Sequence, residues 1–134
     1  MSAVDSSVVV AAFGPWHEYH EVAVAEVRTR PHLPAHVALE AYSVLTRLPE
    51  PFRAEPVLVA EYLRRSYPGR RLQLGVRELT GLPTKLAELR LAGGAVYDAL
   101  IAFTVRAAAT DLATLDRRAQ AVYDRCGVTV RLLH

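Results

Sequence analysis

Four carboxylate side chains stand at positions from which they could act together: Asp5, Glu40, Asp98 and Asp116. Asp5 and Asp116 each follow a short apolar run that is typical of a buried strand. Ligands of open parallel sheets bind beyond the carboxyl ends of the strands, so we expect both acids at that edge. Asp98 begins an almost wholly apolar helix, and Glu40 borders an apolar helical stripe, so both could point inward.

Carboxylates that gather at one place repel one another, and some of them then become protonated near neutral pH. A hard divalent cation removes that penalty, and Mg²⁺ and Mn²⁺ prefer oxygen ligands. One or two such ions can activate a water molecule and neutralise the charge that develops during phosphodiester cleavage. The four acids therefore predict a metal-dependent nuclease centre.

Each acid also has a structural interpretation. Asp5 and Asp116 are residue types that cap helix N-termini, and Glu40 could be a surface residue. Asp98 is the hardest to explain structurally, because its helix offers little polar surface and a lone buried carboxylate costs several kcal/mol. Residue types and spacing alone leave the two interpretations open.

The stretch from Gly93 to Asp116 positions two of the acids and organises the chain. It predicts a buried helix over Ala95–Ala109 and a strand over Leu112–Leu115. The remaining pattern predicts short strands at Met1–Val4, Arg71–Gly75 and Val128–Leu132, and helical segments at Val8–Ala12, Trp16–Arg28, His36–Leu48, Ala54–Tyr67, Val76–Leu91 (in two pieces, broken at Gly81–Pro83) and Arg117–Arg125. Alternating strands and helices indicate an α/β fold with a mostly parallel sheet.

The composition is that of a globular protein. The chain has 134 residues, 51% hydrophobic and 22% charged, which predicts one domain over 1–134. It contains no apolar run long enough to span a membrane, and its start lacks the basic region of a signal peptide. A single cysteine, Cys126, excludes an internal disulfide and fits a cytoplasmic protein.

The net charge of +2 is mild, but the basic residues cluster. Such clusters could meet phosphate groups or could simply be solvated. They lie at Arg64, Arg65, Arg70, Arg71, Lys85, Arg90, Arg117 and Arg118.

Several segments resemble the PIN domain, and more narrowly the VapC-type toxins of bacterial toxin–antitoxin pairs. They are VDSSV near the start, ALEAY, GGAVYDALIA, LATLDRRA and YDRCGVTV. The resemblance implies a three-layer α/β fold with a short, mostly parallel sheet flanked by helices. It implies that Asp5, Glu40, Asp98 and Asp116 form the acidic metal site, and that Ser7 and Thr114 are the small hydroxyl residues beside it.

The same resemblance implies a Mg²⁺- or Mn²⁺-dependent endoribonuclease that cleaves RNA, forms a homodimer or a toxin–antitoxin hetero-oligomer, and is inhibited by a cognate VapB-like antitoxin. An antitoxin helix could lie between the helices at Trp16–Val27 and Ala54–Tyr67 and send a basic residue toward Asp5 and Asp98.

Three other functions remain as alternatives. The chain could be a catalytically silent PIN-like module that only binds RNA or protein, or a DNA-directed nuclease with the same chemistry. It could also be a receiver-like phosphoacceptor domain, although that fold has adjacent acids after its first strand, and here two serines follow Asp5.

Overall fold

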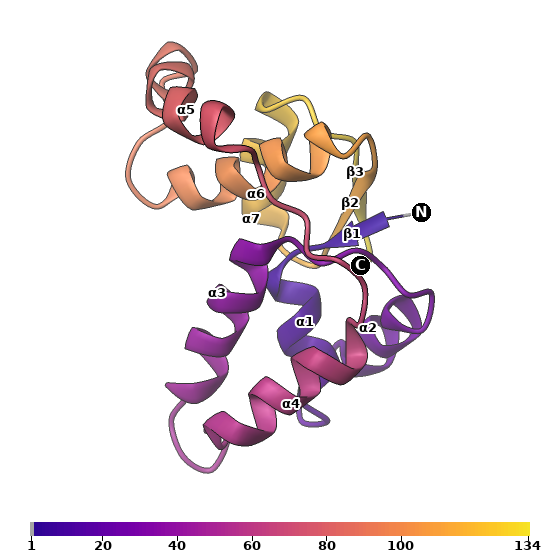
Figure 1. Ribbon diagram of the computed structural model, residues 1–134. Coiled ribbons are helices and arrows are strands. Elements are labelled where there is room, and N and C mark those ends of the chain that lie inside the picture. Colours follow the sequence, from indigo (N-terminus) through magenta and orange to yellow (C-terminus); the bar gives the residue numbers. More distant parts are fainter. Residues whose placement is uncertain (1) are drawn as a thin grey trace.

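The computed structural model describes residues 2–134, which form seven helices around a parallel sheet of three strands (Figure 1). The elements follow in the order β1 (Ser2–Val4), α1 (Ser6–Phe13), α2 (His20–Val27), α3 (Ala35–Thr46), α4 (Pro56–Ser66), α5 (Val76–Glu88), α6 (Ala95–Ala107), β2 (Asp111–Thr114), α7 (Arg117–Arg125) and β3 (Val130–Leu132). None of these helices is long and apolar enough to cross a membrane.

The sheet has the strand order β1-β2-β3, with Val4 opposite Ala113 and Thr114 opposite Leu132. Because the strands are parallel, their carboxyl ends meet at one edge, and Asp5 and Asp116 follow β1 and β2 there. The α/β fold with a mostly parallel sheet is therefore confirmed. Met1 lies outside the described residues, so the predicted first strand is observed from Ser2 onward.

Helices cover the central strand from both directions. Both α1 and α6 contact β2, and α7 contacts β3. In Figure 1, α1 to α4 fill the lower half of the molecule, whereas α5, α6 and α7 lie in the upper half beside the sheet. The core between these layers is aliphatic, with Val8, Ile101, Val105 and Leu112 completely buried.

Local chemistry explains where the helices begin and end. Asp5 caps α1 and Asp116 caps α7, each by accepting two backbone N–H groups. Pro56 occupies the first turn of α4, where its missing N–H costs nothing. Gly127 follows α7 with φ of 80°, a left-handed conformation that glycine adopts without strain.

Three predictions of local structure were wrong. The helix predicted from Trp16 begins only at His20, after turns that follow Gly14-Pro15. Residues 76–88 form one helix through Pro83, because an exposed helix tolerates the loss of one backbone hydrogen bond. The predicted strand at 71–75 is reduced to a single bridge between Leu72 and Pro34, since the sheet does not extend that far.

Candidate active site

Asp5 is the most enclosed of the four acids, with 2% of its surface exposed. Its Oδ1 accepts hydrogen bonds from the backbone N–H groups of Ser7 (3.1 Å) and Val8 (3.4 Å), and from the Ser7 hydroxyl at 2.5 Å. Its Oδ2 accepts from the Thr114 hydroxyl and from the Tyr123 hydroxyl at 2.8 Å. Burial raises the pKa of Asp5 above its ordinary value, and these donors oppose that effect by stabilising the carboxylate.

The Ser7 and Thr114 hydroxyls also connect β1 and α1 to the end of β2. Ser7 Oγ accepts the Leu115 N–H at 2.9 Å, and Thr114 Oγ1 accepts the Asp116 N–H at 2.9 Å. Thr114 is completely buried. The two hydroxyls therefore fix the backbone that presents Asp116 relative to the carboxylate of Asp5.

Asp116 is exposed and caps α7, its Oδ1 accepting the N–H groups of Arg118 (2.9 Å) and Ala119 (3.2 Å). Its cap role and its place beside Thr114 are both observed. The two sequence interpretations of Asp5 and Asp116, helix cap and member of an acidic group, are thus compatible, because each carboxylate sits where a helix starts at the edge of the sheet.

Asp98 lies in the first turn of α6 and is half-buried. Its pKa is raised to about 6, first by burial and then by the negative charges of Glu40, Asp116 and Asp5. A carboxyl that is repelled by all three other acids lies in their field. The influence of these three charges on Asp98 agrees with the prediction that the four acids lie near one another.

Glu40 reaches this region from α3, which contacts α6. Its Oε1 accepts a hydrogen bond from the Ser6 hydroxyl, and its Oε2 lies 3.6 Å from His36 Nε2. The His36 ring stacks on Tyr97, the neighbour of Asp98, with ring centroids 5.5 Å apart. Glu40 is therefore held from α1 and α3 at once.

Ser6, His36 and Tyr123 are the residues of this region that sequence reasoning missed as parts of the site. Ser6 had the best signal, since it lies between Asp5 and Ser7. Tyr123 lies seven residues after Asp116, within α7, and only the folded packing brings its hydroxyl to Asp5. The sequence pattern marks His36 only as the start of a helix, and the structure places it between Glu40 and Tyr97.

The donor set suits a hard cation, because the region offers carboxylate and hydroxyl oxygens and no thiolate. The mutual repulsion recorded at Asp98 is also what a cation would relieve. In the orientations observed, however, no group of three Asp, Glu, His or Cys side chains within residues 2–134 is placed to hold a metal ion. Binding would therefore need side-chain rotation, for which half-buried Asp98 and exposed Asp116 have the room.

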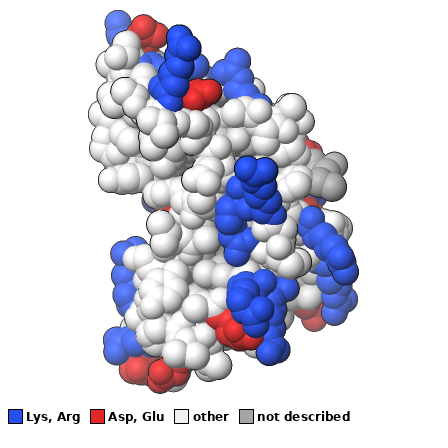
Figure 2. Space-filling view, viewed as in Figure 1, with Lys and Arg blue, Asp and Glu red and all other residues white. Residues whose placement is uncertain are grey.

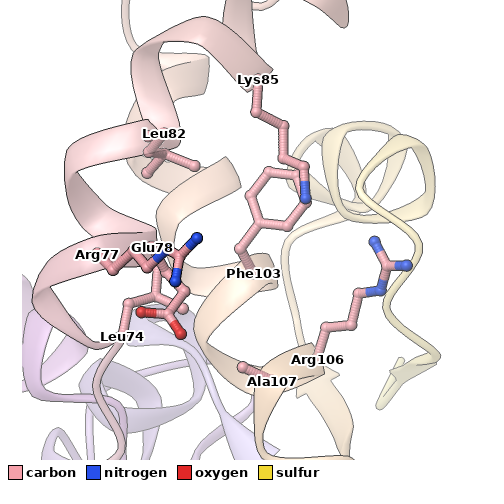
Figure 3. Close-up of a pocket in the computed structure, with 9 residues that line it drawn as sticks. Leu74, Arg77, Glu78, Leu82, Lys85, Phe103, Arg106 and Ala107 are labelled. Atoms are coloured by element: carbon pink, nitrogen blue, oxygen red, sulfur yellow. The ribbon is translucent and has the colours of Figure 1, made fainter.

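A cleft of about 630 Å³ opens beside this acidic centre and is lined in part by Ser6, Ser7 and Asp116. A second cleft, of about 350 Å³, runs between α2 and α4. A third, of about 640 Å³, lies between α5 and α6 and contains none of the four acids (Figure 3).

The PIN domain family model matches residues 3–125. Two similar relatives are proteins named Ribonuclease VapC40, from two strains of Mycobacterium tuberculosis (CDC 1551 / Oshkosh and H37Rv); each is 48% identical over 133 residues, covering 99% of this chain and 99% of the relative. Ribonuclease VapC27 of strain H37Rv is 40% identical over 129 residues, covering 96% of this chain and 93% of the relative. With its acidic centre at the edge of a small parallel sheet, this chain belongs to the PIN domain family and, within it, to the VapC group.

Proposed function

We propose that this chain is an endoribonuclease that acts as the toxin of a toxin–antitoxin pair, and that Asp5, Glu40, Asp98 and Asp116 are its catalytic acids. The observation that carries the proposal is the hydrogen bonding of the Ser7 and Thr114 hydroxyls, which donate to Asp5 and accept the N–H groups of Leu115 and Asp116. The raised pKa of Asp98, to which burial and the charges of Glu40, Asp116 and Asp5 contribute, supports it. The names of the relatives, Ribonuclease VapC40 and VapC27, support RNA as the substrate.

The proposed cofactor is Mg²⁺ or Mn²⁺, held by Asp98 and Asp116 with Asp5 and Glu40 completing the oxygen donors. When bound, such an ion supplies an activated water and offsets negative charge on the cleaved phosphate. The donor chemistry and the crowding of negative charge support this proposal.

The chain's own residues then serve three tasks. Thr114, Tyr123 and Ser7 hold the Asp5 carboxylate by hydrogen bonds, so its orientation is set before substrate arrives. The Ser6 hydroxyl does the same for Glu40. The exposed guanidinium groups of Arg117 and Arg118, directly after Asp116, offer positive charge to the RNA backbone.

The charge distribution favours a polyanionic substrate. Figure 2 shows Lys and Arg side chains at several places on one face, with Asp and Glu side chains next to some of them. Acids that bind a cation would therefore lie in a molecule that otherwise attracts phosphate groups.

The proposed antitoxin site is the cleft between α2 and α4, which combines apolar Val24, Val27 and Tyr62 with Arg28 and Arg65. An antitoxin segment with an apolar stripe and acidic flanks would suit that lining. A basic side chain of the same partner, extended to Asp98, would replace the ion's positive charge.

Exposed Leu39, Val57 and Leu58 offer apolar surface to a second copy, which supports a homodimer. We also propose that the chain is a single PIN domain over 1–134 and that it works in the cytoplasm, where RNA is available; the unpaired, buried Cys126 is consistent with a reducing compartment.

A catalytically silent RNA- or protein-binding module is the second candidate. It is favoured by the saturated hydrogen bonding of Asp5 and by the absence, in residues 2–134, of a ready-made group of three metal ligands. A DNA-directed nuclease would use the same acids.

One experiment separates these functions. The purified chain is incubated with a single-stranded RNA and with DNA of the same sequence, in Mg²⁺, in Mn²⁺ and in EDTA. We expect cleavage of RNA alone, only with a divalent ion, and at least a hundredfold loss in Asp98→Asn, because an ion clamp contributes several kcal/mol to such reactions. Full cleavage by Asp98→Asn would refute the catalytic assignment, and cleavage of DNA at the same rate would refute RNA specificity.

A further inference from the structure

The cleft beside the acidic centre is lined by an aromatic side chain, Tyr19, that the proposed chemistry does not use. Ser6, Ser7 and Asp116 line this cleft, and Tyr19, Arg117 and Arg118 line it as well. Cations and an aromatic ring therefore face the same open space as one of the catalytic acids.

Hydrogen bonds tie this cleft to the acidic centre. The Ser7 hydroxyl donates to Asp5, and the Ser6 hydroxyl donates to Glu40. A molecule that contacts these two serines in the cleft would therefore be separated from the carboxylates of Asp5 and Glu40 by one hydrogen-bonded side chain each.

His134 contacts two residues that line the cleft, Tyr19 and Arg117. The Tyr19 ring packs against the His134 ring, with centroids 4.1 Å apart and planes inclined by 36°. The Arg117 guanidinium donates to the His134 carbonyl at 2.9 Å. Tyr19 is partly exposed, and its ring also neighbours the His17 ring, with centroids 6.0 Å apart and planes inclined by 47°.

An aromatic ring beside exposed cations is typical of sites that bind single-stranded RNA. Bases stack on aromatic side chains in sites that bind single strands, while cations contact the phosphates. In the cleft, Tyr19 could take one base, and the exposed guanidinium of Arg118 could take the phosphate beside Asp116.

The cleft between α5 and α6 is the competing basic surface. It carries Arg77, Lys85 and Arg106, but its aromatic ring, Phe103, is 7% exposed and lies under the Lys85 ammonium, 4.9 Å from the ring centroid (Figure 3). Its ring face is therefore already occupied. Arg106 is also engaged, since it donates to the Cys126 carbonyl.

We infer that the cleft lined by Ser6, Ser7, Tyr19, Asp116 and Arg118 is a nucleotide subsite, in which Tyr19 stacks on one base of the RNA strand and Arg118 contacts its phosphate. The inference rests on the proposed function, because it names how the RNA substrate is held next to the acids. It makes Tyr19 and Arg118 binding residues of that site.

The first test measures binding in EDTA, where cleavage does not interfere. A fluorescently labelled single-stranded RNA is titrated with the wild-type chain and with Tyr19→Leu, Tyr19→Phe and Arg118→Gln. Loss of the ring in Tyr19→Leu should weaken binding about tenfold, whereas Tyr19→Phe should stay within about twofold because stacking is retained. Arg118→Gln should reduce the salt dependence by about one phosphate contact. Arg77→Gln, in the competing cleft, is the matched control and should leave the salt dependence unchanged.

The second test identifies the base. The same titrations are repeated with RNAs in which an abasic nucleotide replaces each position in turn. At one position the abasic RNA should bind Tyr19→Leu and wild type equally, because the stacking partner is missing from both. In Mg²⁺, Tyr19→Leu should raise KM about tenfold with kcat changed less, in contrast to Asp98→Asn, which should lose kcat.

The outcomes separate this inference from the proposed function. Equal RNA affinity of Tyr19→Leu, Tyr19→Phe and wild type, with weaker binding by Arg77→Gln, would place the strand in the other cleft and overturn the inference while leaving the nuclease intact. Undiminished cleavage by Asp98→Asn would overturn the catalytic assignment, whatever the result at Tyr19.

Discussion

The Tyr123 hydroxyl donates a 2.8 Å hydrogen bond to Oδ2 of Asp5 and so joins the last turn of α7 to the end of β1. Both residues are almost fully buried. Burial and the neighbouring Asp5 raise the pKa of Tyr123 far above its ordinary value, so the phenol remains a proton donor throughout the neutral range. The Tyr123 hydroxyl, which does not itself ionise, thereby favours the charged form of Asp5 and opposes the effect of burial.

Removal of this donor should destabilise the fold in a pH-dependent way. We expect Tyr123→Phe to lower the free energy of unfolding by about 1.5–3 kcal/mol at pH 7.5, the usual contribution of a hydrogen bond to a charged group. The loss should shrink as the pH falls and Asp5 takes up a proton, because protonated Asp5 depends less on the donor. Urea unfolding at a series of pH values from 7.5 downward measures this. Tyr62→Phe, which removes a hydroxyl paired with the neutral Tyr67 hydroxyl, is the control, and its effect should not vary with pH.

The stability of the fold should depend on the hydroxyl group of Thr114 more than on its methyl group. Thr114→Val conserves shape but leaves a buried Asp5 oxygen and the Asp116 N–H without this partner, which should cost about 2–4 kcal/mol. Thr114→Ser keeps both hydrogen bonds and should cost about 1 kcal/mol for the lost methyl group. Denaturant unfolding of the two variants measures this difference. If Thr114→Val were at least as stable as Thr114→Ser, the hydroxyl would not make the proposed contribution.

Asp98 should make the ion-free protein less stable as the pH rises. Its pKa is raised to about 6 from 3.8, so the folded state binds the proton more tightly than the unfolded state does. The associated stability is complete below pH 3.8 and is lost as the pH passes 6. The Asp98→Asn variant has no carboxyl group at this position, so it does not lose stability in this way. We expect it to be about 1 kcal/mol more stable than wild type at pH 7.5, a value reduced because solvent screens the charge of a half-buried group. Thermal unfolding in EDTA between pH 4 and 7.5 should show diverging curves; parallel curves would argue against the charge crowding.

A divalent ion should stabilise the wild-type fold. Mn²⁺ at 100 times its dissociation constant adds about 2.7 kcal/mol, or roughly 10 °C in Tm for a domain of this size. Asp98→Asn should lose most of that shift. Asp111→Asn is the matched control, because Asp111 starts β2 at the opposite edge of the sheet and faces Arg131 at 3.9 Å. An equal Mn²⁺ shift in all three proteins would place the ion elsewhere.

The antitoxin and the ion should compete. If a basic antitoxin side chain extends to Asp98, saturating Mn²⁺ should weaken antitoxin binding, and bound antitoxin should weaken Mn²⁺ binding by the same factor. Titration calorimetry with the purified cognate antitoxin, with and without Mn²⁺, measures the coupling. Identical affinities would mean that the partner blocks RNA access without reaching the acids. Arg28→Glu, at the cleft between α2 and α4, should weaken the antitoxin in both conditions.

The sequence was sufficient where a local pattern decides the structure. The buried α6 and the parallel sheet follow from apolar periodicity and strand–helix alternation, and the positions of Asp5 and Asp116 follow from the strand ends. The pattern failed where a residue's effect depends on its tertiary setting: Pro83 is accommodated within α5, and Leu72 has no strand to extend. The hydrogen bond from Tyr123 to Asp5 joins residues 118 positions apart, and no local signal announces it.

The double use of Asp5 and Asp116 as helix caps and acids bears on how such a toxin can be silenced in a cell. Replacement of either acid by alanine removes a cap, worth about 1 kcal/mol, and at Asp5 also disrupts buried hydrogen bonds. Such copies would unfold more often and be removed by proteases. A copy inactivated at Asp98 would keep its fold and accumulate, and it would still bind antitoxin through the cleft between α2 and α4, although without the contact at Asp98. Mutations that abolish the same activity would therefore have opposite effects on any active toxin in the same cell.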